Sequence, residues 1–406
     1  MVYKITPPGK IRGKIKLPAS KSISNRLLVI KALSSVNINI NNLSNAEDTK
    51  TLETLLASEE RTLDCGHAGT TFRFLTAYLS TLKDTRILTG SDRMKQRPIG
   101  VLVEALRGLG AEITYLEEEG FPPLQIEGRS IIGSEVTMDS AISSQFISAL
   151  ILIAPCLDKG LTIHLTDKVV SRPYIEMTLK ALRHFGINAE HKPKSIDIEA
   201  GEYNSGNLKV EADWSSASYW YSIVALANDA EIELEGLNRA SWQGDSVVAE
   251  LFALLGVKTT YTKTGAVLTK TAVHAKEFGY NFINCPDLAQ TVVTTTAALG
   301  IPGIYTGLET LRIKETNRVA ALKSELKKVG VGVEELRHGE IACSPSELKA
   351  SSAPISTFED HRMAMSFAPL SCVLGGLTIE HPGVVAKSYR NYWEDLRSVG
   401  FVIEEV

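Results

Sequence analysis

The chain has few cysteines, no long apolar segment and no excess of charge of one sign, and each shortage excludes a class of protein. Its five cysteines are widely spaced without a CxxC pair, so we expect a reducing compartment with neither a disulfide framework nor a zinc site. The longest apolar run, "FISALILIAPCL", is about half a membrane span and contains a serine and a proline. The first residues, "MVYKITPPGKIRGK", lack the apolar core of a secretion signal. We therefore expect a cytoplasmic protein that does not bind membranes.

The charge balance excludes broad electrostatic binding to polyanions. Over 406 residues the net charge is −4, and 44% of residues are apolar against 22% charged, as is usual for soluble globular proteins. We therefore expect no nucleic-acid partner, and any anion must be bound by a few basic residues gathered locally. The length exceeds what one core holds and predicts two domains.

A helix, a glycine and an alternating strand recur along the chain. In each copy Leu or Val gives the helix one apolar face, and the glycine suits a left-handed C-cap. Helix–glycine–strand units are common in α/β proteins, but the regular spacing of 70 to 76 residues favours a true repeat. With a weaker copy at "EDTKTLETLLASEERTLDC", six copies predict two domains of three units each. The glycines of the other five are Gly110, Gly186, Gly256, Gly330 and Gly400.

A domain boundary is predicted near residues 210–214, where the polar loop in "GEYNSGNLKVEADW" precedes a new helix. The short first strand, "KIRGKIKLP", precedes a candidate anion site and is a candidate member of the second half.

Five motifs in the first half place cations, hydroxyls or glycine at predicted helix starts, where free N–H groups favour a bound anion. They are "PASKSISNR", "CGHAGTTFRF", "GSDRMKQRPIG", "DSAISSQFISAL" and "VVSRPYIEMTL". Each alone is equally compatible with ordinary helix capping or an exposed basic loop. Their candidate residues are Lys21, Ser22, Arg26, Gly69, Arg97, Ser143, Ser144, Gln145, Ser171 and Tyr174.

The second half adds carboxylates to the cations. Asp287 in "CPDLAQ" is either a helix N-cap or a base, and Glu315 stands among cations in "LRIKETNR". A carboxylic acid among cations that hold an anionic ligand is a natural acid or base, although an exposed salt-bridged helix start is common. Lys314, Arg318, Arg362 in "DHRMAM" and Lys387 in "AKSY" complete the set. Helix starts from two domains facing each other would form a positive cleft for a ligand with several phosphates or carboxylates.

Together these motifs resemble the 5-enolpyruvylshikimate-3-phosphate (EPSP) synthase family, the 3-phosphoshikimate 1-carboxyvinyltransferases. The resemblance spans nearly the whole chain, and the combination of "QRPIG", "KETNR" and "DHRMAM" is specific. It implies an α/β fold of two domains of the inverse α/β-barrel type, each with three βαβαββ repeats. The implied domains are 18–212, and 1–17 with 213–406, with the active site in the interdomain cleft that closes on the ligands.

The resemblance also implies a reaction. The family transfers the enolpyruvyl group of phosphoenolpyruvate to the 5-hydroxyl of shikimate 3-phosphate and releases phosphate, on the pathway to chorismate and the aromatic amino acids. It implies small-molecule substrates only, no metal or organic cofactor, and a monomer. The catalytic residues would be Lys21, Asp287 as base on the hydroxyl, and Glu315 as acid and base at C3 of phosphoenolpyruvate.

The binding residues follow from the same resemblance. Phosphoenolpyruvate would contact Lys21, Gly69, Arg97, Gln145, Arg318, Arg362 and Lys387. Shikimate 3-phosphate would contact Lys21, Ser22, Arg26, Ser143, Ser144, Gln145, Ser171, Tyr174, Asp287 and Lys314.

The chain departs from the family pattern at three positions. His67 stands where an asparagine is frequent, Thr310 where some members carry an asparagine that contacts the shikimate phosphate, and Asn317 where aspartate is usual. Gly69 is the position where a small residue admits glyphosate, so we expect glyphosate sensitivity.

Two alternatives remain. The sister enzyme that uses UDP-N-acetylglucosamine usually carries a reactive cysteine, and this chain has none between Cys65 and Cys156. A catalytically dead scaffold is disfavoured because Lys21, Asp287, Glu315 and Arg362 are all present.

Overall fold

The computed structural model describes residues 1–139, 143–166, 169–344 and 348–406. Contacts between residues divide the chain into two compact units, one formed by 20–210 and one by 1–19 together with 211–406. Over the described ranges, every helix is too short or too polar to cross a membrane.

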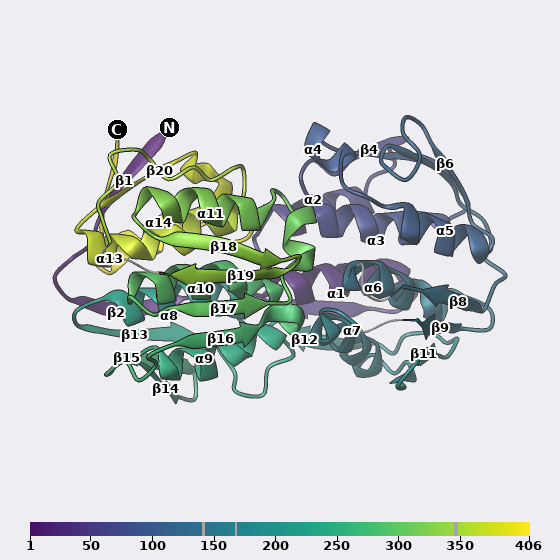
Figure 1. Ribbon diagram of the computed structural model, residues 1–406. Helices are drawn as coiled ribbons and strands as arrows, with labels where there is room; N and C mark the ends of the chain where they lie inside the picture. The colour runs from purple at the N-terminus through teal and green to yellow at the C-terminus, as the bar shows by residue number, and fades with distance from the viewer. Residues whose placement is uncertain (140–142, 167–168, 345–347) are drawn as a thin grey trace. The chain divides into compact units, whose positions relative to one another are not determined.

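The unit 20–210 is built from helices alternating with short strands (Figure 1). In chain order its elements are α1 (Lys21–Leu33), β3 (Ile38–Asn41), α2 (Glu47–Leu56), β4 (Thr62–Asp64), α3 (Gly69–Ser80), β5 (Thr85–Thr89), α4 (Asp92–Lys95), α5 (Gly100–Gly108), β6 (Glu112–Tyr115), β7 (Leu124–Glu127), β8 (Glu135–Met138), α6 (Ser144–Ile153), η1 (Ala154–Cys156), β9 (Leu161–Leu165), α7 (Arg172–His184), β10 (Ala189–His191), β11 (Ser195–Ile198) and β12 (Gly206–Lys209).

The other unit begins and ends with the chain. Its first strands are β1 (Val2–Thr6) and β2 (Ile11–Lys16). It resumes with α8 (Trp214–Leu226), β13 (Ala230–Glu235), η2 (Gly244–Val247), α9 (Val248–Leu254), β14 (Val257–Tyr261), β15 (Gly265–Lys270), β16 (Phe278–Asn281), η3 (Phe282–Asn284), η4 (Pro286–Leu288), α10 (Ala289–Ala298), β17 (Gly303–Thr306), η5 (Glu309–Ile313), α11 (Arg318–Lys328), β18 (Gly332–Arg337), β19 (Glu340–Ser344), α12 (His361–Phe367), η6 (Ala368–Leu370), α13 (Ser371–Leu374), β20 (Leu377–Glu380), η7 (Pro382–Lys387), α14 (Tyr392–Ser398) and β21 (Val402–Glu405).

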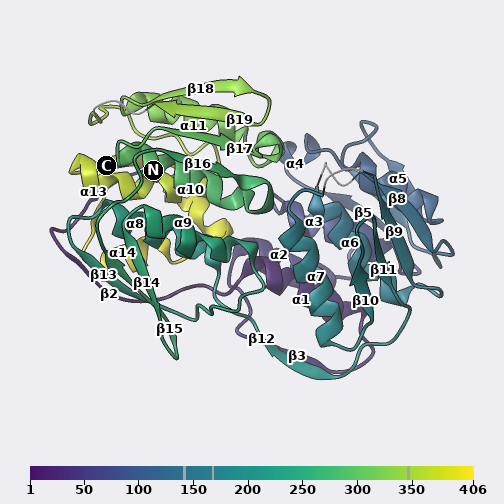
Figure 2. The same ribbon diagram turned by 60° about the horizontal axis from the view of Figure 1, so that its bottom comes forward.

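Four sheets share one topology. Two parallel strands are followed by an antiparallel hairpin whose second strand inserts beside the pair. In three of these sheets a helix separates the parallel strands in the chain, whereas β2 and β13 are separated by the whole unit 20–210 and by α8. The strand orders are β4-β5-β7-β6, β8-β9-β11-β10, β2-β13-β15-β14 and β16-β17-β19-β18. Figure 2 shows β8, β9, β11 and β10 side by side. Because the parallel strands of a pair end at the same sheet edge, the loops that follow them gather there.

The two ends of the chain complete a further sheet of the same plan. β1 lies between β20 and β21 and is antiparallel to both. An isolated parallel bridge joins Ile355 to Ile379 of β20. β1 therefore takes the place that the last strand of a repeat occupies in the four complete sheets. In the same way β12, at the end of the unit 20–210, pairs parallel with β3 near its beginning.

The predicted glycine caps are confirmed. All five glycines have positive φ, between 85° and 106°. Gly110 donates to the carbonyl of Arg107, and Ala111 to that of Leu106, which is the Schellman arrangement. The glycine ends the helix and directs the chain into the next strand.

In the unit formed by 1–19 and 211–406, an inner set of helices is buried on nearly all sides. α10 and α12 consist entirely of buried residues, and only Ser215 of α8 is not buried. Short hydroxyl side chains let these helices approach one another, since Thr291 Oγ1 lies 3.2 Å from Ser218 Oγ and 3.1 Å from Ser366 Oγ. The inner helices thus fix the positions of their own N-termini, where the sequence motifs lie.

Candidate active site

Arg318 organises three carboxylates in the unit formed by 1–19 and 211–406. Its Nε donates to Asp360 Oδ2 at 2.7 Å, Nη1 lies 3.3 Å from Asp287 Oδ1, and Nη2 lies 3.0 Å from Glu315 Oε2. The side chain is 2% exposed. Burial alone would lower the pKa of Arg318, but the charges of Asp360, Glu315 and Asp287 outweigh it and raise the pKa above its ordinary value. The guanidinium therefore stays charged.

Two more cations share the same acids. Arg362 Nη2 donates to Asp287 Oδ2 at 2.7 Å, and Lys387 Nζ lies 3.1 Å from Glu315 Oε1. Arg362 Nη1 also lies 3.1 Å from the hydroxyl of Tyr219. Asp287 and Glu315 are thus each held by two cations. We call Arg318, Arg362, Lys387, Asp287, Glu315 and Asp360 the ionic cluster.

The ionic cluster forms where three helices of this unit begin. Asp360 caps α12, accepting from Arg362 N at 2.8 Å, so the same carboxylate fixes both a helix end and Arg318. Asn317 caps α11 through Ala320 N at 3.1 Å. Asn317 therefore has a capping role at the start of α11. Asp287 lies in η4, immediately before α10.

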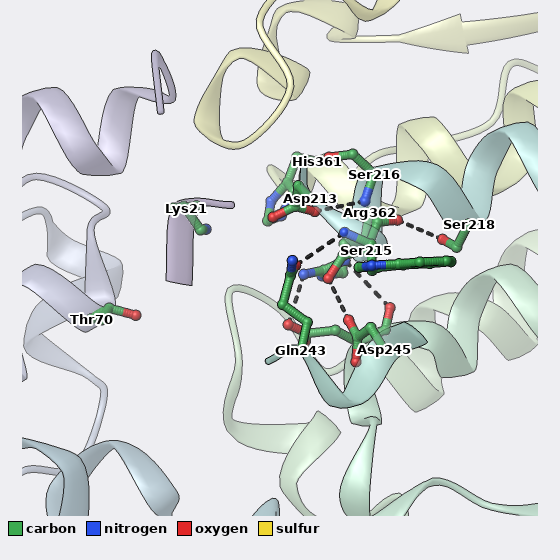
Figure 3. A network of polar contacts seen from close by, with 12 residues as sticks. Lys21, Thr70, Asp213, Ser215, Ser216, Ser218, Gln243, Asp245, His361 and Arg362 are labelled. Carbon is green, nitrogen blue, oxygen red and sulfur yellow. Dashed lines mark hydrogen bonds and ion pairs between the residues drawn. The ribbon is translucent and has the colours of Figure 1, made fainter. Parts of the chain in front are cut away.

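Asp245 is a buried acid that sequence reasoning missed. It is 3% exposed in η2, and its carboxylate accepts from Ser215 Oγ of α8 (Figure 3). Burial first, and then the charge of Asp287, raise the pKa of Asp245 to about 7. Gln243 holds the start of α8 by accepting from Trp214 N at 3.0 Å. Nothing in the sequence "QGDS" distinguishes Asp245 from an acidic residue at the start of any ordinary helix.

In the unit 20–210, Lys21 and Arg26 have different surroundings. Lys21 begins α1, and its Nζ lies 2.9 Å from Asp48 Oδ2. Arg26 is 2% exposed and donates to Thr178 Oγ1 at 2.7 Å, Ser148 Oγ at 3.2 Å and the carbonyl of Ser22 at 2.8 Å. Burial lowers the pKa of Arg26 to about 10, so it remains charged at neutral pH. Arg26 therefore joins α1 to α6 and α7.

Gly69 and Arg97 are in direct contact. A Cβ at Gly69 would lie 2.3 Å from Arg97 Nη1 and 2.7 Å from its Cζ. Arg97 is 6% exposed, and its buried Nε has no hydrogen-bond partner among the described residues. Arg73 donates to the carbonyls of Gly69 at 3.1 Å and Pro98 at 3.3 Å, joining the two loops. The absence of a side chain at Gly69 is what lets the guanidinium of Arg97 occupy its place.

The starts of α6 and α7 carry the remaining predicted residues of this unit. Ser143 caps α6, and Gln145 Nε2 donates to Thr70 Oγ1 at 3.1 Å, which joins α6 to α3. Ser171 precedes α7 with φ 54°, a left-handed conformation that is uncommon for serine. Ser144 is buried, and Tyr174 donates its N–H to the carbonyl of Ser171 at 3.0 Å.

The structure brings five of the predicted residues together in the ionic cluster, and Asp360 joins them. Lys314 lies in extended backbone after η5, and Thr310 lies within η5. Across the described ranges, no group of three or more His, Cys, Asp or Glu side chains could hold a metal ion.

Comparisons with known proteins identify the family. The family model described as EPSP synthase (3-phosphoshikimate 1-carboxyvinyltransferase) matches residues 5–58 and 50–396. The chain belongs to the EPSP synthase family. The chain is 47% identical over 406 residues to a 3-phosphoshikimate 1-carboxyvinyltransferase of Bacteroides fragilis, covering 100% of this chain and 99% of that protein. It is 37% identical to the protein of that name from a Sulfurovum species, covering 97% and 98%.

A solved structure supports the fold. The chain matches an EPSP synthase from Acinetobacter baumannii with a TM-score of 0.79 and 21% identity, covering 100% of both chains. The expected α/β enolpyruvyl-transferase fold, the EPSP synthase resemblance and the carboxyvinyltransferase activity of this family are confirmed. The roles of individual residues stay predictions.

Proposed function

We propose that this chain transfers the enolpyruvyl group of phosphoenolpyruvate to the 5-hydroxyl of shikimate 3-phosphate. Family membership supports the reaction. The observation that carries the assignment of residues is the ionic cluster, in which three carboxylates lie among three buried cations. Such a cluster can bind an anion and exchange protons with it in one place.

In this proposal Arg318, Arg362 and Lys387 hold phosphoenolpyruvate. Glu315 protonates C3, which makes C2 electrophilic, and Asp287 takes the proton of the attacking 5-hydroxyl. The tetrahedral intermediate then loses phosphate as Glu315 recovers a proton from C3, and the proton on Asp287 passes to the departing phosphate or to solvent. The positive charges stabilise the phosphate throughout.

The unit 20–210 supplies the rest of the proposed site. Lys21, Gly69, Arg97 and Gln145 would contact phosphoenolpyruvate, with Lys21 assisting proton transfer. Lys21, Ser22, Arg26, Ser143, Ser144, Gln145, Ser171 and Tyr174, together with Asp287 and Lys314, would bind shikimate 3-phosphate. We propose that domains 18–212, and 1–17 with 213–406, close on both ligands in the cleft between them, and that a cytoplasmic monomer is the active form.

Glu315→Gln tests the proton-transfer role. The amide keeps the size of the side chain but cannot donate an acidic proton, so we expect kcat to fall by about 10²- to 10⁴-fold. Chromatography that quantifies 5-enolpyruvylshikimate 3-phosphate measures the effect. Glu325→Gln, in the helix α11 that follows Glu315, is the control for lost charge. Unchanged turnover in Glu315→Gln would remove Glu315 from the mechanism.

We also propose that the enzyme is sensitive to glyphosate, because position 69 carries no side chain where it contacts Arg97, a residue assigned to phosphoenolpyruvate. Glyphosate should raise the apparent KM for phosphoenolpyruvate. Near-normal turnover in high glyphosate at low phosphoenolpyruvate would contradict this proposal.

A further inference from the structure

The cations assigned to phosphoenolpyruvate already have anionic partners in this unit. Arg362 is paired with Asp287 at 2.7 Å, Lys387 with Glu315 at 3.1 Å, and Arg318 with both acids. An incoming phosphate or carboxylate must therefore compete with Asp287 and Glu315 for the same N–H groups.

The formal charges of the cluster show what this competition does. Three cations and three carboxylates cancel when all are ionised. The Asp287 and Glu315 side chains are 19% and 15% exposed, so water screens them only in part. Asp360 differs from both, because it is fully buried, holds Arg318 through Nε and caps α12. It is therefore the carboxylate that stays in place.

We propose that phosphoenolpyruvate binding is coupled to the uptake of one proton from solvent by the carboxyl pair Asp287–Glu315. The inference rests on the proposed function. When the ligand takes over the cations, the pair loses favourable neighbours and gains an anionic one, and both changes favour its protonated form. Because the two acids share Arg318, the proton belongs to the pair.

Through this coupling, the binding of phosphoenolpyruvate itself protonates the carboxylate that then donates the proton to C3. In the first step a proton from solvent forms an O–H bond on one carboxylate, and no bond to the substrate changes. In the chemical step that O–H bond breaks as the C3–H bond forms, which returns the carboxylate. A carboxylate held by two cations could not otherwise keep a proton at neutral pH.

Other ionisable groups face the same region and must be distinguished from the pair. Asp245 lies under the start of α8 and Asp213 caps that helix, while Tyr219 contacts Arg362. Burial raises the pKa of Tyr219 to about 12, so it keeps its proton. Asp245 and His361 are the competitors, since His361 is buried with Nδ1 3.7 Å from Asp360 Oδ1. The changes Asp245→Asn and His361→Gln remove each of them as a proton acceptor.

Proton uptake can be measured on the intact chain without turnover. Enzyme is mixed with phosphoenolpyruvate alone at pH 8, where the ligand phosphate is already ionised, in dilute buffer with a pH indicator. Calorimetry gives the bound fraction and Kd, and phosphate release with shikimate 3-phosphate shows that the same preparation is active. We expect about half to one proton per bound ligand, and a Kd that rises up to about tenfold per pH unit between pH 7 and 9.

Single-residue variants show which side chains take up the proton. Glu315→Gln and Asp287→Asn should each bind phosphoenolpyruvate at least as tightly as the natural chain, since each removes a competing anion, while proton uptake and the pH dependence of Kd diminish. Asp245→Asn and His361→Gln should each keep both the proton uptake and the pH dependence of Kd. A merely structural loss would weaken binding instead.

Two results would overturn the inference. Binding by an active enzyme with no proton uptake and a Kd independent of pH would refute the coupling and leave the proposed function standing. Uptake lost in Asp245→Asn but kept in Glu315→Gln would refute the assignment to the pair. An enzyme that neither turns over nor binds phosphoenolpyruvate would refute the proposed function as well.

Discussion

The guanidinium of Arg97 lies against Gly69 and leaves no space for a side chain there. A methyl group there would overlap Arg97 Nη1 and Cζ, so the guanidinium would have to move. We expect Gly69→Ala to raise the KM for phosphoenolpyruvate by about tenfold or more and that for shikimate 3-phosphate much less, because misplaced charge weakens one ligand site. Steady-state kinetics with each substrate varied measure the difference. Equal changes in both KM values would contradict the contact.

Asp245 should make stability depend on pH. Its pKa is about 7 in the folded chain, above the ordinary value near 3.9 of an unfolded aspartate. The folded state therefore binds more protons between about pH 4 and pH 7, and its free energy of unfolding falls as pH rises through that window. The free energy of unfolding of Asp245→Asn minus that of the natural chain should therefore be larger at pH 8 than at pH 5. Urea unfolding of both proteins at both pH values measures this difference. An equal difference at both pH values would contradict the shift.

The N-terminus of α12 depends on one buried carboxylate. Asp360→Ala removes both the cap and a partner of Arg318, so we expect a loss of about 3–5 kcal/mol in the free energy of unfolding. Asp360→Asn keeps the cap and separates the two contributions, and it should be less destabilising than Asp360→Ala. Identical losses in the two variants would show that the cap contributes nothing.

The end of α5 offers a matched pair of glycines. Gly110 follows the helix at φ 106°, whereas Gly108 is the last helical residue and has open space around its Cα. We expect Gly110→Ala to lower the free energy of unfolding by about 1–2 kcal/mol, because the backbone is strained for any other residue. Gly108→Ala should be neutral or slightly stabilising. Thermal unfolding compares them, and equal effects would contradict the role of the cap.

The local elements could be predicted from the sequence because their signals are local. Apolar periodicity followed by Gly110 or Gly400 defines a helix and its end, and the motifs mark helix starts. The long-range partners could not be predicted: nothing in "VYKIT" shows that β1 lies between β20 and β21. Asp360 and Asp245 were missed for the same reason, since their importance comes from Arg318 and from Ser215 on other elements.

For the whole molecule, we expect one chain to catalyse the complete carboxyvinyl transfer to shikimate 3-phosphate. The direct measurement is phosphate release from phosphoenolpyruvate by purified protein, with shikimate 3-phosphate or UDP-N-acetylglucosamine as acceptor. We expect phosphate release with shikimate 3-phosphate only. Phosphate release only with UDP-N-acetylglucosamine, or ligand binding without phosphate release with either acceptor, would contradict this expectation.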